Sequence, residues 1–201
     1  MTRYQALKVI AERMTNEVCI VSLGGIVDEW HNIRPEPQGN SMYLMCLGCH
    51  MPLAFGVAVG LPNRNVICLE TDGSALMNLG ILATLGNEAP KNLKIFCFDN
   101  EIYECIGGPI THTSGNVDLA SMARGAGIEE ARTIRTEGEL REATDEALSD
   151  EKTHFIVSKI EPGVEEGIPR KKFDGIEDKY YFVRYLESSE KITIIPPSQH
   201  N

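Results

Sequence analysis

Hydrophobic residues in this chain form short continuous runs that alternate with stretches of helical periodicity. A continuous apolar run is typical of a strand covered on both faces, whereas apolar positions recurring every three or four residues indicate a helix. After the potential cap Thr2, for example, apolar residues stand at 6, 7, 10, 11 and 14. The expected strands are 18–23, 66–70, 93–98, 131–134 and 155–160, and the further expected helices are 51–60, 75–88, 118–127 and 136–148.

Strands and helices that alternate in this way predict an α/β fold, a doubly wound and mostly parallel sheet with helices on both faces. We expect one such domain over residues 1–160. From Glu161 onward the regular alternation ends, and an aromatic run, Tyr180 to Leu186, follows a Pro- and Gly-containing stretch. We therefore expect residues 161–201 to be a C-terminal extension that packs on the core or on a partner chain.

Composition excludes several classes of partner. The 201 residues are 42% hydrophobic and 24% charged, which is ordinary for one globular domain. A net charge of −10 argues against nucleic acid as the main partner, and no apolar run is long enough to cross a membrane. The first residues lack the apolar region of a secretory signal, so we expect a cytoplasmic location.

Polar groups that suit a metal ion follow two of the predicted strands. Asp72, Gly73 and Ser74 come after the strand 66–70, and Asn100 and Ile102 come after the strand 93–98. Ligands of parallel sheets bind beyond the carboxyl ends of the strands, and carboxylate, amide and carbonyl oxygens suit Mg²⁺ held together with phosphates. Each turn alone is also ordinary turn chemistry. Their separation by one helix and one strand is what favours a shared site.

The same two segments resemble the signature of thiamine diphosphate-dependent enzymes. The segment 71–80 reads Thr-Asp-Gly-Ser-Ala-Leu-Met-Asn-Leu-Gly, and the segment 92–100 ends in Asp99-Asn100. The family pattern is Gly-Asp-Gly followed by Asn-Asn or Asp-Asn, and the resemblance covers roughly residues 1–160. Within the family the chain is most similar to decarboxylases of sulfopyruvate and phosphonopyruvate.

The resemblance implies a cofactor, a metal and roles for individual residues. Asp72 and Asn100 would be side-chain ligands of Mg²⁺, with the carbonyl of Ile102 as the third protein ligand, and Gly73 and Ser74 would donate backbone N–H groups to the cofactor's diphosphate. The residues that the resemblance also places near thiamine diphosphate are Gly24, Gly25, Gly48 and Tyr103.

The family's catalytic glutamate lies on a different domain, and no Glu of this chain matches it. The resemblance therefore implies a separate pyrimidine-binding subunit, in an α2β2 or larger hetero-oligomer, without which this chain is inactive. Two departures are visible. Thr71 replaces the first Gly of the signature, and Glu104 stands where relatives have Gly, so that Glu104 would face solvent, contact the partner or alter substrate choice.

Two further segments carry reactive groups. Cys46-Leu47-Gly48-Cys49-His50 matches a haem-attachment string, but we expect small residues at a tight helix start, with His50 near the cofactor or capping the helix. A redox-active cysteine pair is a further alternative. The segment 111–116 is either a substrate-gating loop with His112 as proton donor or an exposed connector. His50 and His112 are the candidate catalytic residues.

The function that the resemblance implies is decarboxylation, or carboligation, of a small 2-oxo acid. The cofactor performs the organic chemistry and the protein supplies position and electrostatics. Two alternatives stay open. In the first, the chain is a subunit of a 2-oxo acid:ferredoxin oxidoreductase. In the second, it is a non-catalytic binding or regulatory subunit that retains the cofactor fold.

Overall fold

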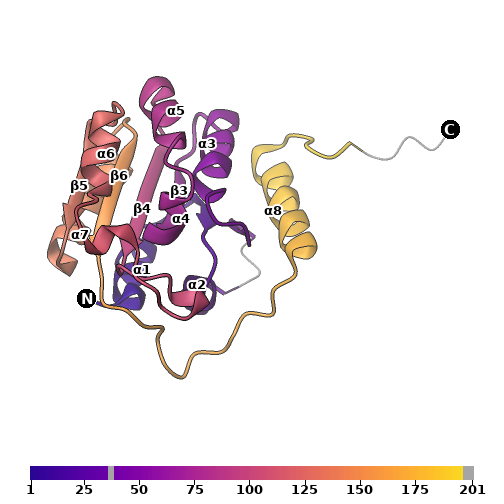
Figure 1. Ribbon diagram of the computed structural model, residues 1–201. Coiled ribbons are helices and arrows are strands. Elements are labelled where there is room, and N and C mark those ends of the chain that lie inside the picture. The colour runs from indigo at the N-terminus through magenta and orange to yellow at the C-terminus, as the bar shows by residue number, and fades with distance from the viewer. Residues whose placement is uncertain (36–38, 197–201) are drawn as a thin grey trace.

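The computed structural model describes residues 1–35 and 39–196, and the expectations for residues 197–201 lie outside this range. The described residues form one sheet in which every neighbouring pair of strands is parallel, which confirms the predicted fold class (Figure 1). In spatial order the strands are β2 (Ser41–Tyr43), β1 (Val18–Val21), β3 (Val66–Thr71), β4 (Leu93–Asp99), β6 (His154–Lys159) and β5 (Glu130–Ile134).

Helices cover both faces of the sheet because successive strand residues point to opposite sides. Along β1, Val18 and Ile20 belong to one hydrophobic core, and Cys19 and Val21 to the other. The first core is closed by α3 (His50–Gly60), α5 (Ile81–Glu88) and α6 (Leu119–Gly125). The second is closed by α1 (Arg3–Ala11), α2 (Gly25–Ile33) and α7 (Glu137–Ser149).

Polar caps mark the starts of two helices that the sequence predicted, α1 and α7. The Thr136 side chain accepts a hydrogen bond from the Glu139 amide while Glu139 accepts from the Thr136 amide, which confirms the predicted capping box of α7. Thr2 forms the same arrangement with Gln5 at the start of α1. No helix in the described ranges has both the length and the apolar character needed to span a membrane.

The structure differs from the sequence prediction between the strands β3 and β4. The single helix expected over 75–88 is two helices, α4 (Asp72–Leu76) and α5, separated by a turn. Asn78 in this turn donates a 2.9 Å hydrogen bond to the Gly48 carbonyl, so the chain is tied to the start of α3 instead of continuing as a helix. The helix α2 and the short strand β2 were not expected at all.

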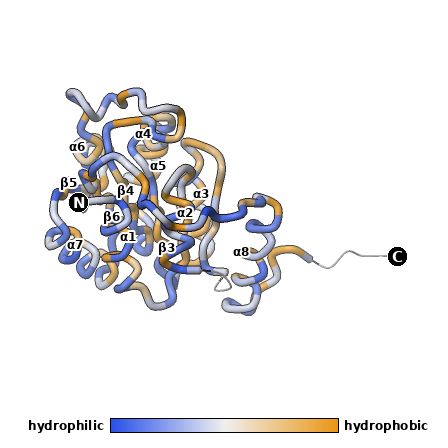
Figure 2. The backbone as a smooth tube through the Cα atoms, turned by 90° about the horizontal axis from the view of Figure 1, so that it is seen from below, coloured by the Kyte–Doolittle hydropathy of each residue, from blue (hydrophilic) through white to orange (hydrophobic). Residues whose placement is uncertain are grey.

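The segment after β6 runs beneath the carboxyl ends of the strands and leads to α8 (Gly175–Glu190), which stands beside α3 (Figure 1). Seen from below, α8 is set to one side of the sheet (Figure 2). Phe182 and Leu186 bury their side chains in the first core. Arg64 donates hydrogen bonds to Ser189 and Glu190, of 2.9 Å and 2.6 Å, and thereby fixes the end of α8.

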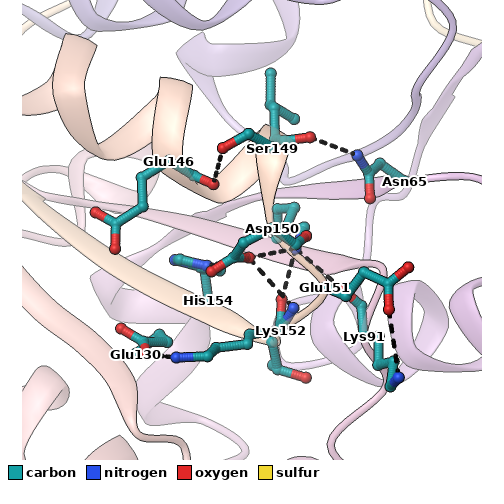
Figure 3. A network of polar contacts seen from close by, with 12 residues as sticks. Asn65, Lys91, Glu130, Glu146, Ser149, Asp150, Glu151, Lys152 and His154 are labelled. Carbon is teal, nitrogen blue, oxygen red and sulfur yellow. Dashed lines mark hydrogen bonds and ion pairs between the residues drawn. The ribbon is translucent and has the colours of Figure 1, made fainter.

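A buried lysine joins the amino end of β4 to the segment that leads into β6. Lys94 at the start of β4 has no exposed side-chain surface, and its ammonium donates to the carbonyls of Lys91, Asp150 and Lys152 at 3.0 Å, 3.0 Å and 2.5 Å. Figure 3 shows the surrounding polar groups, in which Asp150 also contacts His154. This network ties the connection between α7 and β6 to β4, at the end of the sheet away from the predicted site.

Candidate functional site

The candidate site lies where the strand order reverses. From β1 the chain proceeds to β2 on one side, and from β3 it proceeds to β4 on the other, so the carboxyl ends of β1 and β3 flank a crevice. A small cavity of about 30 Å³ opens there. It is lined by Arg3, Leu23, Gly24, Gly25, Leu47, Thr71, Asp72, Gly73, Ser74, Asn100, Ile102, Tyr103, Glu104 and Cys105.

Asp72, the first residue after β3, is a buried carboxylate held by two threonines. Thr111 donates a hydrogen bond of 2.7 Å to Asp72 Oδ2, and Thr113 lies 3.2 Å from the same oxygen and 2.7 Å from Asp99 Oδ1. Burial raises the pKa of the Asp72 carboxyl to about 6, although the hydrogen bond from Thr111 favours the charged form. A buried carboxylate of this kind is stabilised by a nearby cation.

The threonines reach Asp72 because the chain after β4 doubles back on itself. Ile102 forms an antiparallel bridge with Ile110, and Tyr103 donates its amide to the Pro109 carbonyl at 2.8 Å. Glu101 has a φ of 64°, in the left-handed region that few side chains adopt. Asn100 stabilises this bend by accepting the Ile102 amide on its side-chain oxygen at 3.2 Å. Asn100 at this bend is one of the residues that line the cavity.

Gly73 is a position where a side chain does not fit. A Cβ there would lie 2.6 Å from two ring atoms of Tyr103, because the tyrosine ring rests on the glycine backbone. The start of α4 is thus open to close approach by a flat or small group, which at present is the Tyr103 ring.

A buried polar chain supports the opposite wall. Ser74 Oγ accepts the Gly48 amide at 3.0 Å and lies 3.0 Å from His50 Nδ1, while His50 Nε2 lies 2.7 Å from the Leu44 carbonyl. Because a carbonyl only accepts, His50 Nε2 carries a proton. Glu70 lies 3.4 Å from His50 Nδ1, and although burial opposes a charge on the ring, the Glu70 carboxylate raises the pKa of His50.

Glu104 forms part of an ion-pair group at the cavity entrance. Arg3 is buried, pairs with Glu29 at 2.6 Å and with Glu104 at 2.9 Å, and donates to the Gly163 carbonyl at 3.3 Å. Glu104 in turn accepts the Gly163 amide at 2.5 Å. Within the chain, Glu104 therefore anchors the start of the C-terminal extension over the site.

Eight of the eleven residues singled out from the sequence line this one cavity. Gly48 does not line it but bonds to Ser74, which does. His50 is fully buried behind Ser74, and His112 is exposed and outside the cavity. The predicted site residues that line the cavity are Gly24, Gly25, Asp72, Gly73, Ser74, Asn100, Ile102 and Tyr103. Those that do not line it are Gly48, His50 and His112.

Sequence reasoning missed Arg3, Thr111 and Thr113. The segment 111–116 attracted attention for its hydrogen-bonding side chains, but the residue chosen from it was His112. The bridge between Ile102 and Ile110 brings the returning chain back beside the end of β3, and a turn of 3-10 helix over His112–Ser114 follows, so that the hydroxyls of Thr111 and Thr113 both reach Asp72.

The donors gathered here are oxygen atoms of mixed kind: the Asp72 carboxylate, the Asn100 amide and the Ile102 backbone. Within residues 1–35 and 39–196, no group of three His, Cys, Asp or Glu side chains is placed to hold a metal by itself. The site can therefore supply some of the ligands of a hard cation such as Mg²⁺, with a phosphate or water completing its shell.

Known protein families and individual relatives are similar to this chain over most of its length. Residues 28–158 match the model of the thiamine pyrophosphate enzyme C-terminal TPP binding domain. The chain is 31% identical over 187 residues to the sulfopyruvate decarboxylase subunit beta of Methanococcus maripaludis, covering 93% of this chain and 98% of the relative. It is 28% identical to the phosphonopyruvate decarboxylase of Streptomyces viridochromogenes, covering 97% of this chain and 49% of that protein.

Solved structures show the same fold. The benzoylformate decarboxylase of Polynucleobacter necessarius superposes with a TM-score of 0.71 and 23% identity, over 82% of this chain and 34% of that chain. A putative thiamin diphosphate-dependent enzyme of Mycobacterium smegmatis gives a TM-score of 0.69.

Proposed function

We propose, since the chain belongs to the thiamine pyrophosphate enzyme family, that it is the cofactor-anchoring subunit of a decarboxylase acting on a small 2-oxo acid. The observation that carries the proposal is the meeting of Asp72, Asn100 and Ile102 with Gly24 and Gly25 in one cavity at the reversal of strand order. Thiamine diphosphate and Mg²⁺ are its proposed cofactors.

The relatives support a division of the activity between two chains. This chain matches nearly the whole of a protein named as a beta subunit, but only about half of the length of the phosphonopyruvate decarboxylase. We infer that a separate pyrimidine-binding subunit supplies the remainder, including the catalytic glutamate, in an α2β2 or larger hetero-oligomer. A substrate resembling sulfopyruvate or phosphonopyruvate is proposed from the names of these relatives, and a cytoplasmic location belongs to the same proposal.

The residues present fit the proposed cofactor and metal. Asp72 and Asn100 offer side-chain oxygens and Ile102 its carbonyl, a donor set that suits Mg²⁺. Gly73 lacks the Cβ that would prevent a diphosphate from approaching the backbone, but the Tyr103 ring now lies on it. A diphosphate also needs more space than the present 30 Å³. Cofactor binding therefore requires the Tyr103 ring to move away from Gly73.

Within this chain the mechanism is one of positioning. When bound, thiamine diphosphate supplies the electron sink for loss of CO₂. Thr111 holds the Asp72 carboxylate in one orientation, and the hydrogen bond from the Ile102 amide holds the Asn100 side chain at the bend that follows β4. Ser74 is fixed by Gly48 and His50, so this wall of the crevice is held in place before a ligand arrives, whereas the Tyr103 ring on the other side has to move. Such pre-organisation reduces the entropy lost on binding.

The test is calorimetric titration of thiamine diphosphate with Mg²⁺ into the purified protein together with the partner subunit that copurifies. Asp72→Ala removes one of two proposed side-chain ligands and should abolish metal-dependent binding. Glu142→Ala, an exposed carboxylate on α7, is the matched control and should bind as the wild type does. Equal affinity in Asp72→Ala and the wild type would show that the metal site is wrongly assigned.

The alternatives predict different results for the same preparation. A decarboxylase releases CO₂ from a 2-oxo acid, whereas a non-catalytic subunit binds the cofactor without turnover. A subunit of a ferredoxin-linked oxidoreductase is expected to show visible absorption from iron–sulfur clusters in the complex.

A further inference from the structure

We propose that Cys46 and Cys49 form a reversible thiol–disulfide redox site, and that its oxidation weakens binding at the neighbouring cofactor cavity. The two Sγ atoms lie 2.9 Å apart, in direct contact. The first part of the proposal concerns these two cysteines alone. The second part rests on the proposed function.

The backbone between the two cysteines is already shaped for a disulfide. The Cys49 amide donates to the Cys46 carbonyl at 3.2 Å, which closes a four-residue turn. In such a turn the first and last Cα atoms are less than about 7 Å apart, which is close to the range that disulfides span. Gly48 permits the turn because its φ is 77°, and a Cβ there would press on Asn78 at 3.1 Å. Closing the bond therefore needs only a small movement of the sulfur atoms.

The two sulfurs differ in accessibility in a way that suits thiol exchange. Cys46 is exposed, while Cys49 is half-buried at the start of α3. The hydrogen bond with Cys46, and to a smaller degree burial, raise the pKa of the Cys49 thiol, so Cys49 retains its proton. Cys46 is then the sulfur that meets an external reagent, and Cys49 is the resolving thiol.

The proposed step uses a small-molecule or protein disulfide as oxidant. The Cys46 thiolate attacks one sulfur of that disulfide, a mixed disulfide forms, and the first thiolate leaves. Cys49 then loses its proton and attacks Cys46 Sγ, which releases the second thiolate. In total the two cysteines lose two electrons and two protons, and one external disulfide is reduced to two thiols.

The neighbourhood argues against a metal as the partner of these sulfurs. His50, the next residue along the chain, directs its ring atoms to Ser74 and to the Leu44 carbonyl and is fully buried. The pair belongs to no group of three metal-binding side chains among the described residues. A dithiol in contact, without a third ligand, suits redox exchange.

Oxidation is coupled to the cavity through the turn itself. Leu47, between the two cysteines, lines the cavity. Both backbone polar groups of Gly48 bind to α4 and the turn that follows it: its amide donates to Ser74 Oγ at 3.0 Å, and its carbonyl accepts from Asn78 at 2.9 Å. Closing the bond brings the two sulfur atoms closer by about 0.9 Å, from 2.9 Å to the length of a disulfide bond. We infer that the short turn takes up part of this shift, which displaces Leu47 and strains the two hydrogen bonds of Gly48. The oxidised form should therefore bind thiamine diphosphate more weakly than the reduced form.

The first experiment needs no cofactor. The purified protein, with its partner subunit if one copurifies, is equilibrated with oxidised glutathione, its free thiols are alkylated, and peptides are mapped by mass spectrometry. We expect that Cys46 and Cys49 resist alkylation and that the peptide containing them is about 2 Da lighter than the reduced, unalkylated peptide. Dithiothreitol should restore both free thiols. Cys46→Ser and Cys49→Ser should lose this species and accumulate mixed disulfide on the remaining cysteine.

Cys105→Ser is the matched control, because Cys105 is also exposed and also lines the cavity but contacts neither sulfur of the pair. It should oxidise as the wild type does. Full alkylation of both Cys46 and Cys49 after oxidation, or a disulfide that joins either of them to Cys105, overturns the proposal.

The second experiment measures thiamine diphosphate affinity in the reduced and oxidised protein. We expect a dissociation constant at least about fivefold higher after oxidation, and no such change in Cys49→Ser. Equal affinity of the two forms overturns the coupling to the cavity. If the first experiment finds the 46–49 disulfide but neither the reduced nor the oxidised protein binds thiamine diphosphate, the proposed function is wrong and the redox site stands.

Discussion

The Thr111 hydroxyl donates a 2.7 Å hydrogen bond to Asp72, a residue 39 positions earlier in the chain. This contact joins the loop after β4 to the end of β3. Both side chains are almost completely buried, at 1% exposure each. Thr111 is thus a positioning residue for the proposed metal ligand. It binds Oδ2 of the Asp72 carboxylate and so restricts the rotation of this group, while it makes no hydrogen bond to Oδ1.

Replacement of Thr111 by Val should weaken Mg²⁺-dependent cofactor binding roughly tenfold. Valine keeps the shape of threonine but lacks the hydroxyl, and hydrogen bonds to charged groups contribute about 1.5–3 kcal/mol. Thr111→Ser retains the hydroxyl and should bind within about threefold of the wild type. Calorimetric titration of both variants checks this.

Thr133→Val is the control for the Thr111 series, because Thr133 is an exposed residue of β5. It should leave the affinity unchanged. If Thr111→Val and Thr133→Val bind equally well, Thr111 does not position Asp72.

Strand ends were predictable in this protein, whereas contacts across loops were not. Asp72 and Asn100 could be expected to share a site because each follows a buried apolar strand, and the carboxyl ends of parallel strands lie at one edge. Thr111 and Thr113 depend on the bend at Glu101, whose positive φ has no marker in the sequence. A glycine would have signalled such a bend, but a glutamate does not.

The elements missed from the sequence lack the usual signals. The strand β2 has only three residues, and α2 starts after Gly24 without any capping side chain. In α8 the apolar positions belong to a short aromatic run, and Phe182 and Leu186 are the ones that reach the core. Their burial depends on α3 lying beside them, which local sequence does not encode.

The pair of His50 and Glu70 should make stability depend on pH above about 6.5. Although burial opposes a charge on the ring, Glu70 raises the pKa of His50 above its ordinary 6.5. A group whose pKa is higher in the folded state binds its proton more tightly there, so its contribution is complete below pH 6.5 and is lost as the pH rises through the raised value.

Urea unfolding at pH 6, 7, 8 and 9 tests this dependence. The free energy of unfolding of the wild type should fall more steeply over this range than that of Glu70→Gln, in which the carboxylate is removed at nearly constant shape. Glu142→Gln, on the exposed face of α7, should follow the wild type. Parallel curves for the wild type and Glu70→Gln would show that the pair is not charged.

Close packing of α5 against α6 depends on Gly86. A Cβ at this position would lie 1.7 Å from the carbonyl oxygen of Ala126 and 2.6 Å from its carbon, so Gly86→Ala forces two backbones apart. We expect a loss of about 3 kcal/mol or more, at the upper end of overpacking effects. In α3, a Cβ at Gly56 would meet no atom within 4 Å.

Gly56→Ala is therefore the matched control for Gly86→Ala. It should raise stability by about 0.5–1 kcal/mol, because alanine favours the helix and restricts the unfolded chain. Urea midpoints of the two variants, measured against the wild type, should move in opposite directions. A common direction would contradict the packing of α5 on α6.

Lys94 and Lys91 lie at the same end of the sheet but should contribute very differently to stability. The Lys94 ammonium is fully buried among three carbonyls and Asp150, and burial lowers its pKa. Lys94→Met should cost about 3–5 kcal/mol, because it leaves buried acceptors unpaired. Lys91 is 74% exposed and pairs with an 85% exposed Glu151, so Lys91→Met should change stability by less than about 0.5 kcal/mol.

Because this network (Figure 3) lies at the amino ends of the strands, neither substitution should alter cofactor affinity under conditions in which the protein is folded. Chemical denaturation gives the two stabilities, and calorimetry at low temperature gives the affinities. If Lys94→Met weakens cofactor binding while the protein remains folded, the two ends of the sheet are not independent, and the site at Asp72 needs β4 to be held at its amino end.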